Sequence, residues 1–177
     1  MNNEIKQIID SCDACQTLRP SQPKETLQPS HADGPMDSVS VDLFHYGGKE
    51  YLVMVDRYSG FTWVTPLSST ITSKITSHLL QWFLDFGFPQ TIRSDGGPQF
   101  RSEFDSFLEE HNIIHEVSSP YNPKSNGSAE AAVKNMKHLL DKCQGYNTDF
   151  MRAFAKWRNT PKAYNFSLTQ LMFGGYQ

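Results

Sequence analysis

Apolar and polar residues alternate in the first well-patterned segment of the chain. The alternation runs over residues 39–43, and a period of two is typical of a strand with one buried face. Two more short apolar segments, 51–55 and 61–64, follow turn-forming pairs at 47–48 and 59–60. Three short strands joined by tight turns predict an antiparallel meander.

Helical and extended patterns alternate through the rest of the chain. Apolar residues recur every three or four positions in four segments, which predicts helices over 73–86, 102–111, 128–143 and 148–159. Two short apolar segments between the helices predict strands over 91–94 and 113–117. Strands separated by helices pair in parallel through right-handed crossovers. The whole pattern predicts an α/β fold: a five-stranded mixed sheet, three strands antiparallel and two parallel, with helices on its faces.

Composition fits one folded domain with a small appendage. The chain has 177 residues, 38% of them apolar, which suffices for a sizeable core. No apolar run approaches the roughly 18 residues that cross a bilayer, and the first residues lack the features of a signal peptide. Because the three cysteines are an odd number, a disulfide framework is not expected. We therefore expect an intracellular protein without a membrane partner.

Charge is segregated along the chain. The net charge of −3 gives no sign of a nucleic-acid partner by itself. Residues 1–116, however, hold 16 Asp and Glu against 8 Lys and Arg, whereas residues 117–177 hold 3 against 8. The basic excess of the second part favours contact with a polyanion.

Three carboxylates are candidates for a functional site, one within a predicted strand, one at a strand end and one at a helix start. Asp42 lies in the first strand, on the side opposite to its apolar residues. Asp95 ends the fourth strand and precedes Gly96 and Gly97, which let the backbone turn without crowding the carboxylate. Glu130 lies in the first turn of the third predicted helix. Strand ends in α/β sheets are where sites are built, so the sequence predicts a shared acidic site.

The chemistry of this acidic site points to divalent metal ions, because converging carboxylates would otherwise repel one another. Oxygen ligands suit Mg²⁺ or Mn²⁺, and two such ions about 3.5–4 Å apart can activate a hydroxyl and stabilise the leaving oxygen of a phosphodiester. Lys134 and Lys137 share the Glu130 face of the helix and are candidates for holding a phosphate backbone. On this interpretation Asp42, Asp95 and Glu130 are both the catalytic residues and the metal ligands.

Three sequence blocks around these carboxylates resemble one known family. The blocks are Val-Asp-Leu-Phe at 41–44, Ser-Asp-Gly-Gly-Pro-Gln-Phe at 94–100 and Ser-Pro-Tyr-Asn-Pro-Lys-Ser-Asn-Gly-Ser-Ala-Glu at 119–130. In this order they are similar to the catalytic core of the integrases of retroviruses and Ty3/gypsy-type long-terminal-repeat retrotransposons. Residues 157–161 and 167–174 resemble the segment that follows this core in Ty3/gypsy-type elements.

The resemblance implies a ribonuclease-H-like fold and a polynucleotidyl transferase that uses a D-D-E motif. Such an enzyme acts both as an endonuclease and as a transferase. Its reactions would be metal-dependent processing of 3′ ends and strand transfer of element DNA into target DNA. By position in the motifs, the expected DNA contacts are Tyr121, Lys124, Lys134 and Lys137. The implied partners are DNA and further copies of the chain, and the expected location is the nucleus, within an integration complex.

The N-terminal segment carries Cys12 and Cys15, which are half of a tetrahedral zinc site. A His-His-Cys-Cys zinc module precedes the core in the integrase family, and residues 5–12 resemble its end. The resemblance thus implies that residues 1–24 are the end of this module and a linker, and that residues 25–177 are the catalytic core with a following helical segment. Two thiolates leave two ligand positions unfilled, so zinc is expected only where the missing upstream ligands are present.

Other functions and simpler roles stay open. A domesticated or decayed integrase core would serve as a non-catalytic DNA- or protein-binding module, and a simple metal nuclease can use the same fold. Asp56 fits a turn cap better than a fourth metal ligand, and His45 fits an exposed strand end better than a proton shuttle. Phe154 and Trp157 fit core positions on their predicted helix.

Overall fold

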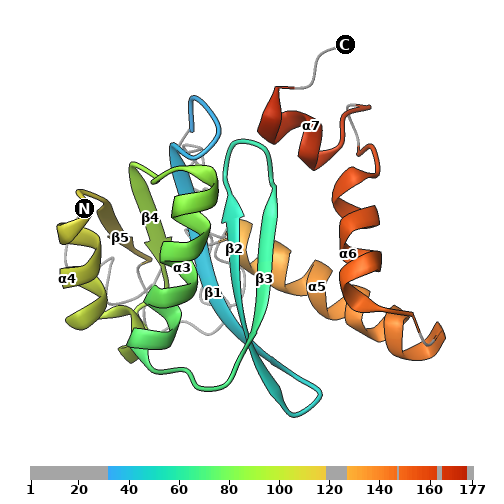
Figure 1. Ribbon diagram of the computed structural model, residues 1–177, viewed down its shortest axis with the longest axis horizontal. Coiled ribbons are helices and arrows are strands. Elements are labelled where there is room, and N and C mark those ends of the chain that lie inside the picture. Colours follow the sequence, from blue (N-terminus) through green and yellow to red (C-terminus); the bar gives the residue numbers. More distant parts are fainter. Residues whose placement is uncertain (1–31, 119–126, 147, 163–164, 175–177) are drawn as a thin grey trace, which may run out of the picture. The chain divides into compact units, whose positions relative to one another are not determined.

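Five strands form one sheet in the computed structural model, which describes residues 32–118, 127–146, 148–162 and 165–174. The strand order is β3-β2-β1-β4-β5. The strands are β1 (Ser38–Tyr46), β2 (Lys49–Asp56), β3 (Thr62–Leu67), β4 (Thr91–Ser94) and β5 (Ile114–Val117). The helices are α3 (Thr72–Phe86), α4 (Glu103–Glu110), α5 (Gly127–Tyr146), α6 (Phe150–Asn159) and α7 (Leu168–Phe173), with a 3-10 turn η1 (Pro98–Phe100) (Figure 1).

The chain divides into two units, Met1–Ser30 and His31–Gln177, and all described residues belong to the second. The proposed boundary between a zinc-module end and a catalytic core at residues 24 and 25 stays a prediction.

The sheet has the pairing that the sequence predicts. β1 pairs with β2, and β2 with β3, in antiparallel fashion, whereas β4 lies parallel to β1 and β5 parallel to β4. The turn between β1 and β2 uses Gly47 and Gly48 at φ values of 56° and 76°, which glycine adopts without steric cost. The fold class of five strands, three antiparallel and two parallel, with helices on the faces is therefore confirmed.

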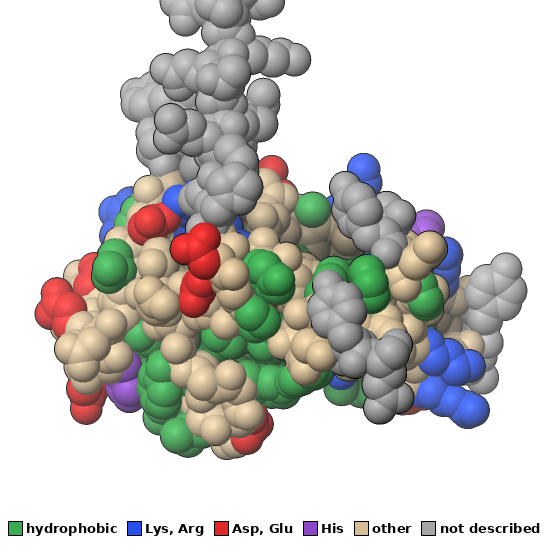
Figure 2. All heavy atoms as spheres, turned by 90° about the horizontal axis from the view of Figure 1, so that it is seen from above, with side chains coloured by type: hydrophobic (Ala, Val, Ile, Leu, Met, Phe, Trp, Pro, Cys, Tyr) green, Lys and Arg blue, Asp and Glu red, His purple; other side chains and the backbone are tan. Residues whose placement is uncertain are grey.

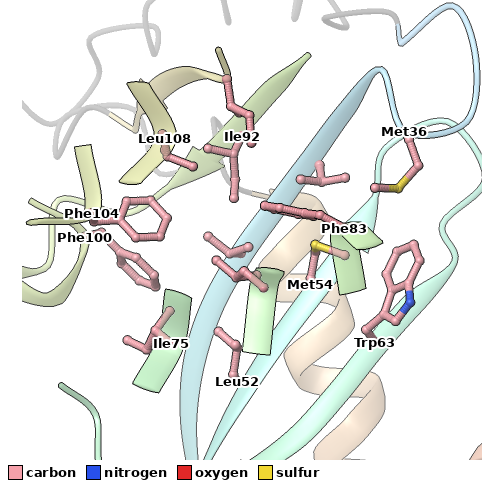
Figure 3. Packing of buried hydrophobic residues seen from close by; sticks show 14 of the residues in the cluster. Met36, Leu52, Met54, Trp63, Ile75, Phe83, Ile92, Phe100, Phe104 and Leu108 are labelled. Carbon is pink, nitrogen blue, oxygen red and sulfur yellow. The ribbon is translucent and has the colours of Figure 1, made fainter. Parts of the chain in front are cut away.

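Each face of the sheet carries its own hydrophobic core. The first core lies under α3, α4 and α7, and its largest fully buried side chains include Phe83, Phe100 and Phe104 (Figure 3). The second core lies under α5 and α6, and Met136, Leu140 and Phe154 are among its buried members. In Figure 1, α3 lies in front of the sheet and α5 behind it.

Two short elements escape the sequence patterns. Helix α7 has six residues, too few for a period of 3.6 to show, and its start is fixed by a capping box between Ser167 and Gln170. The turn η1 has three residues and begins at Pro98. The other four helices and all five strands lie where the periodicity predicts them, and Phe154 is a core residue as predicted.

Among the described helices, none combines the length and the apolar character needed to span a bilayer.

Candidate active site

The parallel pairing of β1 and β4 brings two of the predicted carboxylates together. Ser40 lies beside Arg93 in the β1–β4 ladder. Asp42 and Asp95 each follow two residues later, so the register places them side by side, and side chains two residues apart on a strand share a face. Helix α5 packs against β1 and β2 and carries Glu130 in its first turn.

The carboxyl group of Asp42 has a raised pKa, and several neighbouring groups contribute to the shift. Burial is the largest of the effects that raise the pKa of Asp42 from 3.8 to about 6. The Leu43 N–H donates a hydrogen bond to Asp42 Oδ1 at 2.8 Å, which lowers the pKa. The charges of Asp95 and Glu130 raise the pKa further, and the charge of Lys137 lowers it. Both of the other predicted carboxylates therefore act electrostatically on Asp42.

The donor chemistry of this acidic site fits a divalent cation. All three donors are carboxylates, the hard oxygen ligands that Mg²⁺ and Mn²⁺ prefer. In the described part of the chain, none of Asp42, Asp95 and Glu130 forms an ion pair with a basic side chain. Nowhere in the same residues do three His, Cys, Asp or Glu side chains gather closely enough to hold a metal ion. The role of the three carboxylates as metal ligands stays a prediction.

The turn after β4 leaves room for the Asp95 carboxylate. Asp95 is exposed, and its Oδ1 accepts a hydrogen bond from the Gly97 N–H at 3.1 Å. A Cβ at Gly97 would lie 3.0 Å from Asp95 Oδ1, closer than most real Cβ contacts. The glycine therefore keeps the carboxylate free of steric crowding, as the sequence predicts.

Two lysines follow Glu130 along the exposed side of α5. Lys134 and Lys137 are exposed, and Lys137 Nζ lies 5.9 Å from the centroid of the Phe44 ring, which is two residues after Asp42. In Figure 2 the Lys and Arg side chains lie mainly toward the right, the side of α6 in Figure 1, and the acidic side chains mainly toward the left. The position of Lys137 near Asp42 is consistent with the predicted phosphate contact, which no observation yet tests.

A polar contact far from the predicted motifs fixes α5 over β1. The Tyr46 hydroxyl donates to Asp141 Oδ1 at 2.7 Å and approaches Gln144 Oε1 at 3.1 Å. The bond to Asp141 raises the pKa of Tyr46 to about 12. Tyr46 ends β1 and Asp141 lies near the end of α5, so this contact holds the strand with Asp42 against the helix with Glu130.

The simpler roles expected for two other residues are confirmed. Asp56 is fully buried, and its carboxylate accepts hydrogen bonds from the Met36 N–H, the Ser59 N–H and the Ser59 hydroxyl. It therefore closes a turn. His45 is exposed at the end of β1 and lies 2.7 Å from Glu50 Oε1 through Nδ1.

A hydrogen-bonded chain next to Asp95 was missed by sequence reasoning. His115 Nδ1 lies 2.5 Å from Asp105 Oδ1, and its Nε2 lies 2.8 Å from Ser94 Oγ. Ser94 Oγ also lies 2.9 Å from the backbone oxygen of Asp95. Ser94 is fully buried, so its hydroxyl has no access to a substrate and the chain fixes the end of β4. The three side chains come from β4, α4 and β5, and no local motif links them.

Several predicted site residues lie outside the described residues. Tyr121 and Lys124 belong to the segment between β5 and α5, and Cys12 and Cys15 belong to the first unit. Their proposed roles in DNA and zinc binding stay predictions.

Comparison with known proteins decides the family. Residues 32–123 match the family described as Integrase core domain, a stretch that includes Asp42 and Asp95 and ends before Glu130. The chain belongs to the integrase core family. This is a family of polynucleotidyl transferases. The recognition from the three sequence blocks is thereby confirmed.

Retroviral polyproteins are similar to this integrase core over most of its length. The Pro-Pol polyprotein of feline foamy virus is 32% identical over 153 residues, which cover 80% of the chain and 13% of the polyprotein. The Gag-Pro-Pol polyprotein of simian retrovirus SRV-1 is 31% identical over 146 residues, which cover 78% of the chain and 8% of that polyprotein. The chain thus spans only a small part of these curated relatives.

Solved structures share the ribonuclease-H-like fold. The intasome of simian T-cell lymphotropic virus in complex with the PP2A regulatory subunit B56 gamma matches with a TM-score of 0.78 at 24% identity, covering 97% of the chain and 66% of that chain. The catalytic core of BIV integrase matches with a TM-score of 0.65 at 19% identity, covering 78% and 95%. The HTLV-2 integrase catalytic core, solved in complex with magnesium in a trimeric form, gives 0.63 at 23% identity, covering 80% and 99%.

Proposed function

We propose that this integrase core processes the 3′ ends of element DNA and transfers them into target DNA, using Mg²⁺ or Mn²⁺. The observation that carries the proposal is the convergence on Asp42, whose pKa is raised by the charges of both Asp95 and Glu130. The charges of Asp95 and Glu130 both disfavour the ionised form of Asp42, and none of the three carboxylates forms an ion pair in the described residues, which supports a role in binding divalent metal. The HTLV-2 integrase core, which shares the fold, was solved with magnesium.

Each residue contributes from a fixed element. Asp42 presents its carboxylate from the middle of β1, Asp95 from the turn directly after the parallel strand β4, and Glu130 from the first turn of α5. These three carboxylates would hold divalent ions, which would lower the pKa of an attacking hydroxyl and stabilise the leaving oxygen of the phosphodiester. Lys134 and Lys137 lie on the exposed side of α5 and bind the phosphate backbone of the DNA beside the carboxylates.

The proposal extends to partners and place of action. Strand transfer needs two DNA substrates, the element end and the target, and we propose that copies of this chain assemble to hold them. One similar protein was solved as an intasome and another as a trimer. Because the target of integration is chromosomal DNA, the proposed location is the nucleus.

A strand-transfer assay tests the proposal. Purified protein is incubated with oligonucleotides that carry element ends and with plasmid target, in Mg²⁺ and separately in Mn²⁺. Wild type is expected to join the oligonucleotide to the target, and Asp42→Asn, Asp95→Asn and Glu130→Gln each to abolish joining. Glu109→Gln is the matched control, because Glu109 is an exposed carboxylate on α4, and it is expected to retain joining.

The products distinguish the alternatives. Cleavage without joining would indicate a simple metal nuclease on the same fold. DNA binding without cleavage or joining, by a folded protein, would contradict catalysis and indicate a domesticated or decayed binding module. Activity that survives Asp42→Asn or Asp95→Asn would show that the site assignment is wrong.

A further inference from the structure

A cavity of about 320 Å³ lies on the α5 side of the sheet, apart from the carboxylates. Its walls come from the end of β2, the start of β3, the first two turns of α5, and the segment from α6 to α7. Arg57, Ser128, Asn135, Trp157 and Lys162 are among the residues that line it. On α5, Ser128 and Asn135 lie roughly 140–160° around the helix from Glu130, so the cavity and the acidic site occupy different sides of the helix.

Arg57 is the unusual residue at the border of this cavity. Its Nε and Nη1 atoms are buried and have no hydrogen-bond partner within the described residues. Arginine carries five N–H donors, and buried polar atoms in folded proteins are nearly always satisfied. Burial, with a smaller contribution from the charge of Arg93, lowers the pKa of Arg57, and the negative charge of Glu116 partly opposes this shift. Arg57 as a whole is half-buried, and its unsatisfied buried donors are costly unless a ligand or a small side-chain movement supplies acceptors.

A second cation reaches the same cavity from another element. Lys162 follows α6, and its Nζ lies 4.6 Å from the centroid of the Trp157 ring. In the part of the chain that the structure describes, neither Arg57 nor Lys162 forms an ion pair with a carboxylate. Residue Asp56 also borders the cavity, but its carboxylate is bonded to Met36 and Ser59 on the other side of the sheet.

Helix α5 adds a favourable field and neutral donors. Ser128 lies in its first turn, where the backbone N–H groups and the helix dipole favour an anion. The side chains of Ser128 and Asn135 supply hydroxyl and amide donors along the same wall. Two cationic residues from separate elements, a helix start and polar donors thus border one space, whose other walls are apolar and include Ala131, Leu168 and Trp157.

We propose that this cavity is a binding site for a phosphate group, held by Arg57 and Lys162. The planar fork of an arginine matches the oxygens of a phosphate, and lysine adds a point charge. Both a small phosphorylated compound and the phosphodiester backbone of a nucleic acid present this chemistry. The site is separate from the proposed catalytic function and does not depend on it.

Inorganic phosphate is the probe for the test. Wild-type protein is titrated with sodium phosphate, against sodium chloride of equal ionic strength, while the melting temperature and the Trp157 indole N–H resonance are followed. Phosphate is expected to raise the melting temperature and to shift this resonance saturably, because a ligand bound only by the folded state stabilises it. Arg57→Met and Lys162→Gln are each expected to weaken binding by about tenfold or more.

Controls keep the test independent of folding defects. Lys156→Gln is the matched control, because Lys156 is an exposed lysine of α6 that does not line the cavity, and it is expected to bind phosphate as wild type does. Arg57→Met is expected to keep or raise the melting temperature in chloride, since it removes two buried donors that lack acceptors. If that variant does not fold, the phosphate affinity of Lys162→Gln still tests the proposed site.

A DNA duplex without terminal phosphates distinguishes the two sources of phosphate. A duplex that shifts the Trp157 resonance and competes with inorganic phosphate would identify the nucleic-acid backbone as the ligand. A duplex that leaves the resonance unchanged would identify a small phosphorylated compound, and both results support the site. No saturable effect of phosphate beyond chloride, or equal affinity in wild type and Lys162→Gln, would overturn the proposal.

Discussion

The two faces of the sheet differ in how completely their buried polar side chains are satisfied. On the face under α3, α4 and α7, Asp56 accepts three hydrogen bonds and both ring nitrogens of His115 have partners. On the face under α5 and α6, Ser40 Oγ and the buried nitrogens of Arg57 have none within the described residues. Asp42, on the same face, is repelled by two other carboxylates.

This difference indicates that one face serves mainly stability, whereas the other face holds the candidate functional sites. The first face is rich in aromatic side chains, and Trp63 Nε1 is its one buried donor without a partner in the described part. A core that serves stability satisfies its polar groups, whereas unsatisfied or repelling groups persist where a ligand completes them. The face under α5 and α6 thus holds the predicted metal site and the proposed phosphate site.

The largest effect is expected from removing one carboxylate of the acidic site. Asp95→Asn should lower strand transfer by about 10³-fold or more, equivalent to about 4 kcal/mol, because a metal-ligand charge is lost. The same variant should unfold at nearly the wild-type denaturant concentration, since Asp95 is exposed. A rate within tenfold of wild type would contradict the assignment.

A substitution in the core under α3 and α4 should instead lower the stability of the fold. Phe104 is fully buried and contacts the rings of Phe100 and His115. Phe104→Ala should lower the free energy of unfolding by about 3–5 kcal/mol through lost burial and a cavity. Urea unfolding measures this, and Leu84→Ala, at a side chain that is 66% exposed, is the control expected to change little. Equal effects of the two variants would contradict the assignment of this core.

Substitutions of two aspartates, Asp56 and Asp42, should change the free energy of unfolding in opposite directions. Asp56→Ala leaves the Met36 N–H, the Ser59 N–H and the Ser59 hydroxyl without their acceptor. The expected loss is about 2–3 kcal/mol of unfolding free energy, the cost of unsatisfied buried donors. Denaturant unfolding at neutral pH measures it, and an unchanged midpoint would show that these bonds contribute nothing net.

Asp42→Asn should instead stabilise the metal-free protein at pH 8, by about 1 kcal/mol. A pKa raised from 3.8 to about 6 means that the folded state binds the proton more tightly than the unfolded chain does. The stability that the neutral carboxyl contributes is fully present below pH 3.8 and is lost as the pH rises through about 6. Since Asp42 is only half-buried, the full value of the shift is reduced by solvent screening.

The pH dependence supplies the control for this variant. Unfolding free energies of wild type and Asp42→Asn should approach each other as the pH falls toward 4, because both side chains are then neutral. A variant that is less stable than wild type at pH 8 would contradict the electrostatic account of this face.

Local sequence patterns predicted what depends on local physics. Periods of 2 and 3.6 located the strands and the longer helices, and the contexts of Asp42, Asp95 and Glu130 named the acidic site. The cavity proposed to bind phosphate escaped prediction because Arg57 and Lys162 lie far apart in the sequence and border one space only in the folded chain. The chain from Asp105 through His115 to Ser94 escaped for the same reason, since it joins three separate elements.

The central claim is that Asp42 belongs to an acidic site whose carboxylates bind a divalent cation. The carbon-13 shift of the Asp42 carboxyl, followed against pH with and without Mg²⁺, tests it most directly. Without metal the pKa is expected to be about 6, and with Mg²⁺ it is expected to fall well below that value because the cation favours the charged form. A carboxyl that titrates near 3.8 without metal, or whose pKa Mg²⁺ leaves unchanged, would contradict the claim.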